Sequence, residues 1–314
     1  MKFNYKTILR HFASFVFAAL AITFASCGDN SFNGPTSGED DGGGNVANKN
    51  ANVVKTDRAV LRLEFPALKA SGDQELIVHR TSSAVYDADR VNYATEWDCD
   101  RKSQRWSCYQ MHQGYSGKYS RVADFMFDPS LPNGSYWADF NYFPGFDRGH
   151  ICPSGDRTFA QDANSQTFYM SNMQPQYHCF NGYDDQGNEG LWLRMENKLR
   201  QWAKSLSRTD TLFVCKGGTI DDEKNIIKRI DGKVIVPKYF FMAILRKDSR
   251  GYAAMAFWSE QTNQWRTNET LLSHAMSIDE LEKLTGIDFF CNLPDAVEER
   301  VESSFNAAGW TGLK

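Results

Sequence analysis

The sequence predicts an α+β fold in which helices flank a central antiparallel β-sheet. Strand-like and helical segments are mixed along the chain, without the regular βαβ alternation of a parallel sheet. Aromatic residues make up 14% of the chain, so a core is well supplied. Residues 57–314 are long enough for one large domain and contain no internal repeats.

The chain begins with the pattern of a lipoprotein-type signal peptide over residues 1–26. Basic residues precede an apolar run at 12–24, which is too short to span a bilayer comfortably. Small residues then precede Cys27, as in a bacterial lipobox, in which the cysteine is lipidated and becomes the mature N-terminus. An ordinary secretory signal cut nearby is the alternative.

Residues 27–56 predict a flexible tether, because a run rich in Gly, Asn, Ser and Asp cannot bury apolar surface. Behind a lipidated Cys27, such a tether would let a folded domain stand off a membrane. We therefore expect an exported protein of the cell envelope, anchored by lipid to the outer membrane on its periplasmic or its outer face.

Charge and cysteine content set further expectations. The net charge of −4 gives no broad basic field for nucleic acid, although a local basic patch would still act at short range.

Six cysteines remain beside Cys27, and an oxidising compartment would permit disulfides. Cys99 and Cys108 flank a charged turn and are candidates to cross-link a hairpin. Cys152 and Cys179 bracket the first half of a polar block, and buried free thiols are the alternative for every pair.

Residue alternation and β-propensity predict a series of strands along the domain. The first alternates apolar and charged residues, and Asp231-Gly232 is a strong two-residue hairpin signal. The expected strands are 59–65, 75–79, 91–97, 105–112, 146–151, 211–214, 225–230, 233–236, 239–245 and 252–258.

Three helices are also expected. Apolar residues at helical spacing predict an amphipathic helix at 192–206. A capping box at 277–280 opens a second helix that Gly286 closes, and Pro294 begins the last one, which runs through 301. The first helix has a basic side that is either a solvated surface or a patch for phosphate. It consists of Arg194, Lys198, Arg200 and Lys204.

The tetrapeptide Asp147-Arg148-Gly149-His150 opens a block of about fifty residues that ends at Glu196. With a pKa near 6.5 when unperturbed, His150 can take a proton from water, and activity should then fall below about pH 6. Arg148 offers a planar fork of donors to phosphate, or a salt bridge to Asp147. Asn172 is expected to fix a turn nearby. A base, a cation and oxygen ligands for a hard metal are the parts that a phosphodiester hydrolase needs.

The runs FDRGHICPSGDR, TFYMSNMQPQ and NEGLWLRME, with VPKYFFMAIL, GYAAMAFW and SIDELEKLTGIDFFCNLPD downstream, resemble the DNA/RNA non-specific endonuclease family. That family includes the Serratia-type nuclease and mitochondrial endonuclease G, and the resemblance covers about residues 88–304. It implies a ββα-metal (His-Me finger) site beside the sheet, Mg²⁺ or another divalent cation such as Mn²⁺, and DNA and RNA as substrates. It also implies His150 as the catalytic histidine and, from a less regular spacing, Arg121 as a second phosphate-binding arginine.

The same resemblance implies one asparagine as the metal ligand, and two residues compete for that role. Counting forward from Pro175 favours Asn181, whereas counting back from Trp192 and Glu196 favours Asn188. Asn188, Trp192 and Glu196 are spaced four and four, which places all three on one stripe of one helix. We therefore expect Asn188 to bind the metal, with Asn181 as the alternative. Glu196 would orient metal-bound water or pair with Arg200.

The sequence thus predicts a Mg²⁺-dependent endonuclease that hydrolyses DNA and RNA irrespective of the sugar. Two other classes stay open at this point. One is a catalytically silent protein that binds nucleic acid, and the other is a structural lipoprotein of the cell surface, for which the tether and the acidic composition speak.

Overall fold

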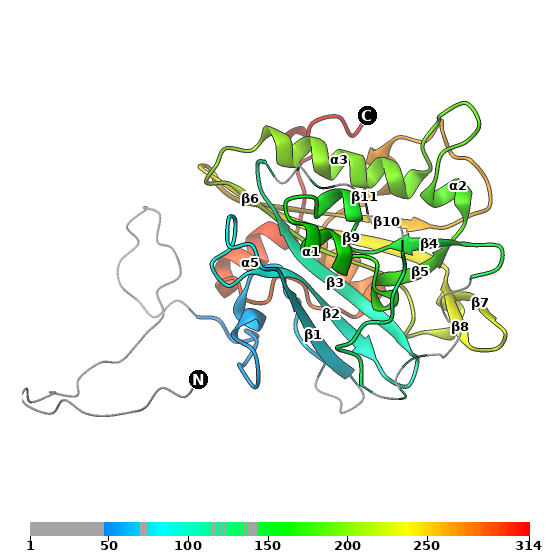
Figure 1. Ribbon diagram of the computed structural model, residues 1–314. Helices are drawn as coiled ribbons and strands as arrows, with labels where there is room; N and C mark the ends of the chain where they lie inside the picture. Colours follow the sequence, from blue (N-terminus) through cyan, green and yellow to red (C-terminus); the bar gives the residue numbers. More distant parts are fainter. Residues whose placement is uncertain are drawn as a thin grey trace, which may run out of the picture. The chain divides into compact units, whose positions relative to one another are not determined.

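A seven-stranded antiparallel sheet carries the fold, in the order β1-β2-β3-β6-β9-β10-β11 (Figure 1). The predicted α+β class with a central antiparallel sheet is confirmed. The strands are β1 (Gln74–Arg80), β2 (Val91–Asp98), β3 (Ser103–Met111), β6 (Thr211–Gly218), β9 (Tyr239–Asp248), β10 (Gly251–Glu260) and β11 (Ala275–Met276).

The computed structural model describes residues 47–69, 74–114, 117, 119, 121, 124–132, 134, 136 and 143–314. All of them belong to one compact unit, Asn45–Lys314. The predicted signal peptide, with Cys27 behind it, lies outside the described residues. Within the described part of the chain, no helix combines the length and the apolar character needed to cross a membrane.

The sheet buries both of its faces. Helix α3 (Leu191–Ser205) packs in one hydrophobic cluster with Tyr109 of β3, and α4 (Ile278–Thr285) and α5 (Asp295–Glu302) pack in another with the neighbouring Cys108. Successive side chains of a strand point to opposite faces, so the two clusters lie on opposite sides of the sheet. Figure 1 shows α3 running along one side of the strands and α5 behind them.

Two small hairpins complete the β structure. One joins β4 (Asp147–His150) to β5 (Met173–Gln176), and the other joins β7 (Ile226–Ile230) to β8 (Val234–Pro237) around the predicted Asp231-Gly232 turn. The short helices are α1 (Gln161–Gln166), α2 (His178–Asn181) and the 3-10 turns η1 (Arg58–Leu61), η2 (Ser154–Asp156), η3 (Met170–Asn172), η4 (Glu223–Asn225), η5 (Leu271–His274) and η6 (Ala307–Gly309).

Most elements lie where the residue patterns predict them. The capping box of Ser277 and Glu280 is formed, and Gly286 ends α4. The strand predicted at 59–65 is wrong, because this segment forms η1 and a turn. The alternation does not match the burial either, because Phe65 is fully buried whereas Leu61 is exposed and the charged Glu64 is buried.

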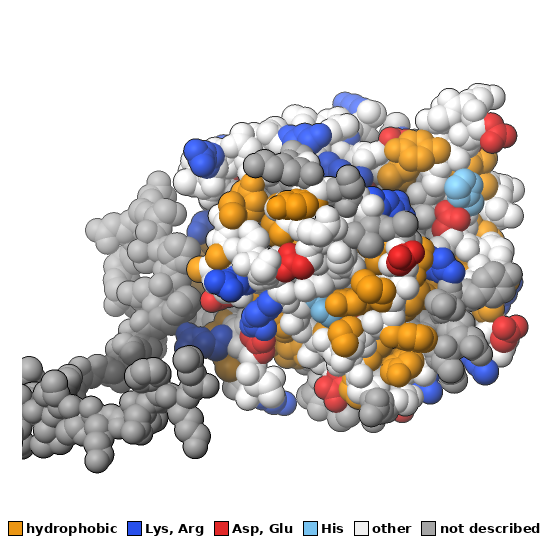
Figure 2. Space-filling model, viewed as in Figure 1, with side chains coloured by type: hydrophobic (Ala, Val, Ile, Leu, Met, Phe, Trp, Pro, Cys, Tyr) orange, Lys and Arg blue, Asp and Glu red, His pale blue; other side chains and the backbone are white. Residues whose placement is uncertain are grey.

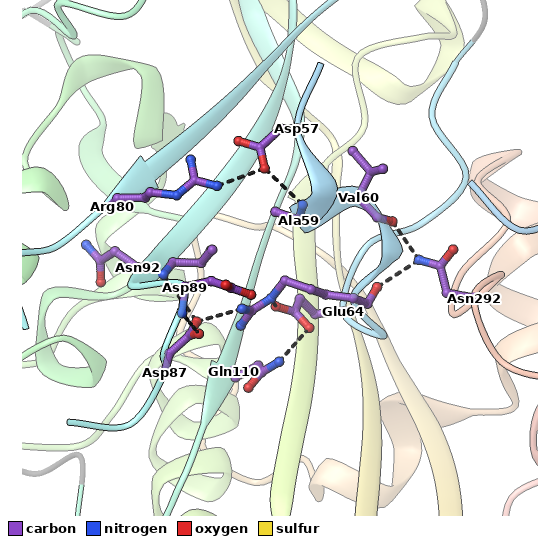
Figure 3. Close-up of polar contacts among 12 residues, drawn as sticks. Asp57, Ala59, Val60, Glu64, Arg80, Asp87, Asp89, Asn92, Gln110 and Asn292 are labelled. Carbon is purple, nitrogen blue, oxygen red and sulfur yellow. Dashed lines mark hydrogen bonds and ion pairs between the residues drawn. The ribbon is translucent and has the colours of Figure 1, made fainter. Parts of the chain in front are cut away.

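The predicted tether ends earlier than residue 56. Residues 47–52 are hydrogen-bonded to residues 288–298, for example through the side-chain amide of Asn48, which donates to the carbonyl of Leu293 at 2.8 Å. The segment that follows is also tied to the sheet and to the C-terminal part of the chain. Figure 3 shows Asn292 donating to the carbonyl of Val60 and Gln110 donating to Glu64.

The cysteine pairs considered from the sequence form no disulfides. Cys108, Cys152, Cys179, Cys215 and Cys291 are free thiols, which excludes both a Cys99–Cys108 and a Cys152–Cys179 bridge. The strand register explains the first case, because Cys108 lies opposite Cys215 of β6.

Candidate active site

A cleft of about 900 Å³ opens between the β4–β5 hairpin, α2 and α3. It brings together five of the six residues singled out in the sequence, together with one further arginine. These residues are Arg121, Arg148, His150, Asn181, Glu196 and Arg200.

His150 ends β4, opposite Met173 of β5. Its Nε2 atom is buried and has no hydrogen-bond partner among the described residues, while the ring bonds to the backbone of Arg148, which leaves Nδ1 as the donor. Burial lowers the pKa of His150 to about 3, and the positive charges of Arg121 and Lys216 act in the same direction. The imidazole is therefore neutral near pH 7, with a lone pair on Nε2.

Two phenylalanine rings pack near the His150 ring, and each of them also stacks against one arginine. The rings of Phe125 and Phe168 lie 6.0 and 5.0 Å from the His150 ring, centroid to centroid. The guanidinium of Arg148 lies 4.5 Å from the centre of the Phe125 ring, and that of Arg121 lies 5.3 Å from the centre of the Phe168 ring. Stacking on aromatic rings holds a guanidinium in place without neutralising it.

Gly149 leaves room for a side chain of the facing strand. A Cβ at this position would lie 2.1 Å from Oε1 of Gln176, a fully buried side chain of β5. Any other residue would displace the Gln176 side chain beside His150. The glycine of the tetrapeptide thus reflects packing next to the site.

Asn172 fixes the turn that follows β4, as predicted. Its side chain accepts a hydrogen bond from the backbone N–H of Cys152 at 2.8 Å and donates to the carbonyls of Cys152 and Thr167, also at 2.8 Å. The residue is fully buried, so these three bonds hold the backbone on either side of the hairpin.

Asn181 is the last residue of α2 and lines the cleft. Its Nδ2 donates to Oδ2 of Asp147 at 3.1 Å, and Nδ1 of His178 lies 2.9 Å from the same oxygen. The hydrogen bond to Asp147 raises the pKa of His178. Among the described residues, Oδ1 of Asn181 accepts no hydrogen bond, so a carbonyl-type oxygen is left for a ligand.

Asn188 lies outside the cleft. The prediction that it shares a helical stripe with Trp192 and Glu196 is wrong, because α3 begins at Leu191. Asn188 is exposed and closes a tight loop, in which its backbone and side-chain N–H groups donate to Asp184 at 2.7 and 2.8 Å. Gly190 is the N-cap of α3 and has extended backbone, and a Cβ there would lie 2.5 Å from the carbonyl oxygen of Phe180.

Glu196 is bound by two basic side chains. Oε1 accepts from Nζ of Lys216 at 2.8 Å, and Oε2 accepts from Arg200 at 3.3 Å, so the predicted pair with Arg200 is present. Arg200 in turn donates to Asp156 at 2.6 Å. Lys216 is fully buried in β6, with Nζ 4.5 Å from the centre of the Trp192 ring. A lysine in the otherwise apolar run TLFVCKGG is the one sequence signal that could have identified it.

The basic side of α3 does not form one phosphate patch. Arg194 donates to the backbone carbonyls of Arg266 and Glu269, Arg200 lines the cleft, and Lys198 bonds to Gln201. On the face shown in Figure 2, basic and acidic side chains are interspersed, with basic groups gathered over α3 at the top.

Comparison with known proteins agrees with this geometry. The family model for the DNA/RNA non-specific endonuclease matches residues 72–296. A nuclease of Nostoc sp. is 28% identical over 226 residues, covering 67% of this chain and 75% of the relative, and bovine mitochondrial endonuclease G is 26% identical over 234 residues, covering 71% and 75%. One chain of the solved EndoG/EndoGI complex shares the fold, with a TM-score of 0.57 at 21% identity over 77% of this chain and 94% of that one.

Proposed function

Because this chain belongs to the DNA/RNA non-specific endonuclease family and is an endonuclease, we propose that it hydrolyses phosphodiester bonds in DNA and RNA with His150 as general base and Mg²⁺ as cofactor. The observation that carries the proposal is the buried, unpartnered Nε2 of His150 between two arginines in the cleft. Membership in a nuclease family argues against a catalytically silent or purely structural surface protein.

His150 would take a proton from the attacking water. A general base must be unprotonated at the working pH, and the low pKa of His150 ensures this. The hydrogen bond between its ring and the Arg148 backbone fixes the orientation of Nε2. Within the part of the chain that the structure describes, Nε2 has no hydrogen-bond partner to displace before a water molecule binds.

Arg148 and Arg121 would bind the phosphate and the charge that develops on it. Both guanidinium groups line the cleft, and neither forms an ion pair in the described residues. The buried Nε of Arg148 has no hydrogen-bond partner in the described segments, as expected for a donor that binds an anionic ligand.

Nucleases of this family generally depend on a divalent metal, and the donor set of the cleft fits a hard cation. Asn181 offers an unbonded amide oxygen, and Glu196 lies in the same cleft to orient water around the ion. A single protein ligand with water in the remaining positions suits Mg²⁺, which gives up its hydration water reluctantly. When bound, the ion would stabilise the negative charge on the phosphate and on the leaving oxygen.

Export and lipidation of Cys27 are part of the same proposal. They rest on the sequence pattern of residues 1–27 alone. Detergent phase separation tests them: the full-length protein should enter the detergent phase when expressed in a bacterium, and Cys27→Ala should stay in the aqueous phase. An aqueous wild-type protein would instead favour an ordinary secretory signal.

Plasmid DNA and a single-stranded RNA, incubated with the purified protein, test the activity. We expect both to be cut in Mg²⁺ and neither in excess EDTA, with activity restored by added Mg²⁺. His150→Ala should be inactive on both. Cleavage that persists in EDTA, or by His150→Ala, would contradict the mechanism.

A further inference from the structure

Three carboxylates from two helices meet on the far side of the sheet from the cleft. Asp279 and Glu282 lie one turn apart on α4, and Glu302 ends α5. One carboxylate oxygen from each lies within 4.8 Å of the others. The two helices pack on the hydrophobic cluster opposite that of α3, so this group is separated from the candidate active site by the sheet.

No positive charge compensates this cluster among the described residues. None of the ion pairs involves these three carboxylates, or the nearby Asp288 and Glu298. Asp288 and Glu298 are instead capped by the side-chain amide of Asn50, at 3.2 and 2.8 Å. Like charges that gather without a counter-ion destabilise a folded protein, so the arrangement calls for a partner.

The lack of a neutralising partner is clearest at Glu302. The residue is 5% exposed, and its Oε1 is buried with no hydrogen-bond partner among the residues that the structure describes. Burial, together with the charges of Glu282 and Glu298, raises the pKa of Glu302 to about 10. A buried carboxylate persists only if a proton or a cation neutralises it.

We propose that Asp279, Glu282 and Glu302 form a Ca²⁺ site that joins α4 to α5. Ca²⁺ accepts irregular sets of carboxylate oxygens at about 2.3–2.6 Å, so two ligands of one ion lie up to about 5 Å apart. The spacing of the three oxygens falls within that limit. Mg²⁺ fits less well, because it needs near-octahedral ligands at about 2.0–2.1 Å.

The function of such an ion is to hold the C-terminal helices together. It replaces repulsion between α4 and α5 with a shared ligand, and it binds only the folded chain, so it stabilises the protein by mass action. Asn50 ties residues of the N-terminal segment to the same acidic region. The site therefore also supports the place where that segment joins the folded domain.

Thermal unfolding with and without Ca²⁺ tests the proposal. The whole protein is stripped with EDTA and dialysed, and melting is followed in a Mg²⁺-free buffer with 1 mM CaCl₂ or none. We expect Ca²⁺ to raise the Tm of the wild type by ~5 °C. Glu302→Gln should show no such rise, and without Ca²⁺ it should melt close to the wild-type temperature, because the amide is neutral like the protonated acid that the raised pKa of Glu302 favours.

Two control variants separate this site from other effects. Glu299→Gln removes an exposed carboxylate from the same helix, and Asn181→Ala removes the proposed metal ligand of the cleft. Both should keep the full Ca²⁺ response, while Glu302→Gln should keep nuclease activity in Mg²⁺. If Glu302→Gln fails to fold, Asp279→Asn serves in its place, and calorimetric titration should find one Ca²⁺ fewer than in the wild type.

Three results would overturn the site. These are a wild-type Tm that does not respond to Ca²⁺, an equal response in Glu302→Gln, and a response lost in Asn181→Ala. The first would mean that a proton alone neutralises Glu302, and the last would place the effect in the cleft.

Discussion

Asn181 donates its side-chain amide to the carboxylate of Asp147, with 3.1 Å between Nδ2 and Oδ2. The bond ties the end of α2 to the first residue of β4, and therefore to the strand that carries His150. It also engages the nitrogen end of the carboxamide and leaves the oxygen end for a cation. Asn188, by contrast, uses its amide to close an exposed loop.

Replacing each asparagine by alanine should separate the two assignments. We expect Asn181→Ala to lose more than the about 10–100-fold typical of residues that only orient a metal ligand, and to need more Mg²⁺ for half-maximal rate. Asn188→Ala should stay close to wild type, because it only loosens the loop at 184–188. Mg²⁺ titrations of plasmid cleavage by both variants measure this. An inactive Asn188→Ala beside an active Asn181→Ala would reverse the assignment.

The sequence predicts which residues share the cleft better than it predicts which of the two asparagines lies there. The tetrapeptide, Arg121 and Glu196 all lie at one cleft, because a short motif fixes the local β4 geometry and the hydrophobic pattern fixes α3. The two asparagines are seven residues apart in a glycine-rich stretch. The backbone conformation between α2 and α3 decides which of the two asparagines faces the cleft. Glycine residues permit many conformations there, so the sequence does not predict that conformation.

Lys216 and residues 59–65 are two further features that the sequence does not predict correctly. The side chain of Lys216 reaches Glu196 across the contact between β6 and α3, and such a tertiary pair leaves no spacing signal in the sequence. Residues 59–65 have the alternation of a strand, but tertiary packing on the sheet holds them as η1 and a turn. In this segment the period of two predicts neither the backbone conformation nor the buried side, because Leu61 is exposed and Glu64 is buried.

His150→Ala should abolish most hydrolysis while the fold is kept. Removing a general base typically costs about 10²–10⁴-fold in rate. The side chain forms no hydrogen bond to another side chain, so the hairpin should tolerate the change, as circular dichroism and Tm can confirm. Equal rates for the variant and the wild type would remove His150 from the mechanism.

The pH profile should differ from that expected for an ordinary histidine. With a pKa of about 3, His150 stays unprotonated from pH 8 down to about pH 5, so the rate should not fall with a midpoint near 6.5. The sequence alone predicts a loss below about pH 6, and burial beside Arg121 and Lys216 changes that expectation. Initial rates at constant ionic strength, from pH 4.5 to 8, test it. A single acid limb centred between pH 6 and 7 would show that this pKa is not depressed.

The same shift links His150 to stability. Between about pH 3 and 6.5 the unfolded chain binds a proton at this histidine that the folded chain does not, so the shift destabilises the fold as pH falls through this window. His150→Gln removes that contribution. The difference in unfolding free energy between His150→Gln and wild type should therefore favour the variant more at pH 4.5 than at pH 7.5. An unchanged difference would indicate that His150 titrates alike in both states.

Lys216 and Glu196 form a buried ion pair that connects β6 to α3 at the cleft. The lysine is fully buried and the side chain of Glu196 is 8% exposed. Removing one partner of a buried pair leaves an uncompensated charge, which typically costs about 3–5 kcal/mol, whereas replacing both partners can be nearly neutral. Arg200 stays beside Glu196 in the single variant and should keep the loss toward the lower end of that range.

Lys216→Met should therefore lower the unfolding free energy by about 3 kcal/mol, and Lys216→Met with Glu196→Gln should recover most of it. Activity should not recover in the same way, because the double variant lacks the carboxylate that is proposed to orient water in the cleft. Denaturant unfolding and plasmid cleavage of the two single variants and the double variant complete the cycle. If the double variant regains both stability and activity, Glu196 acts only as the partner of Lys216 and has no part in hydrolysis.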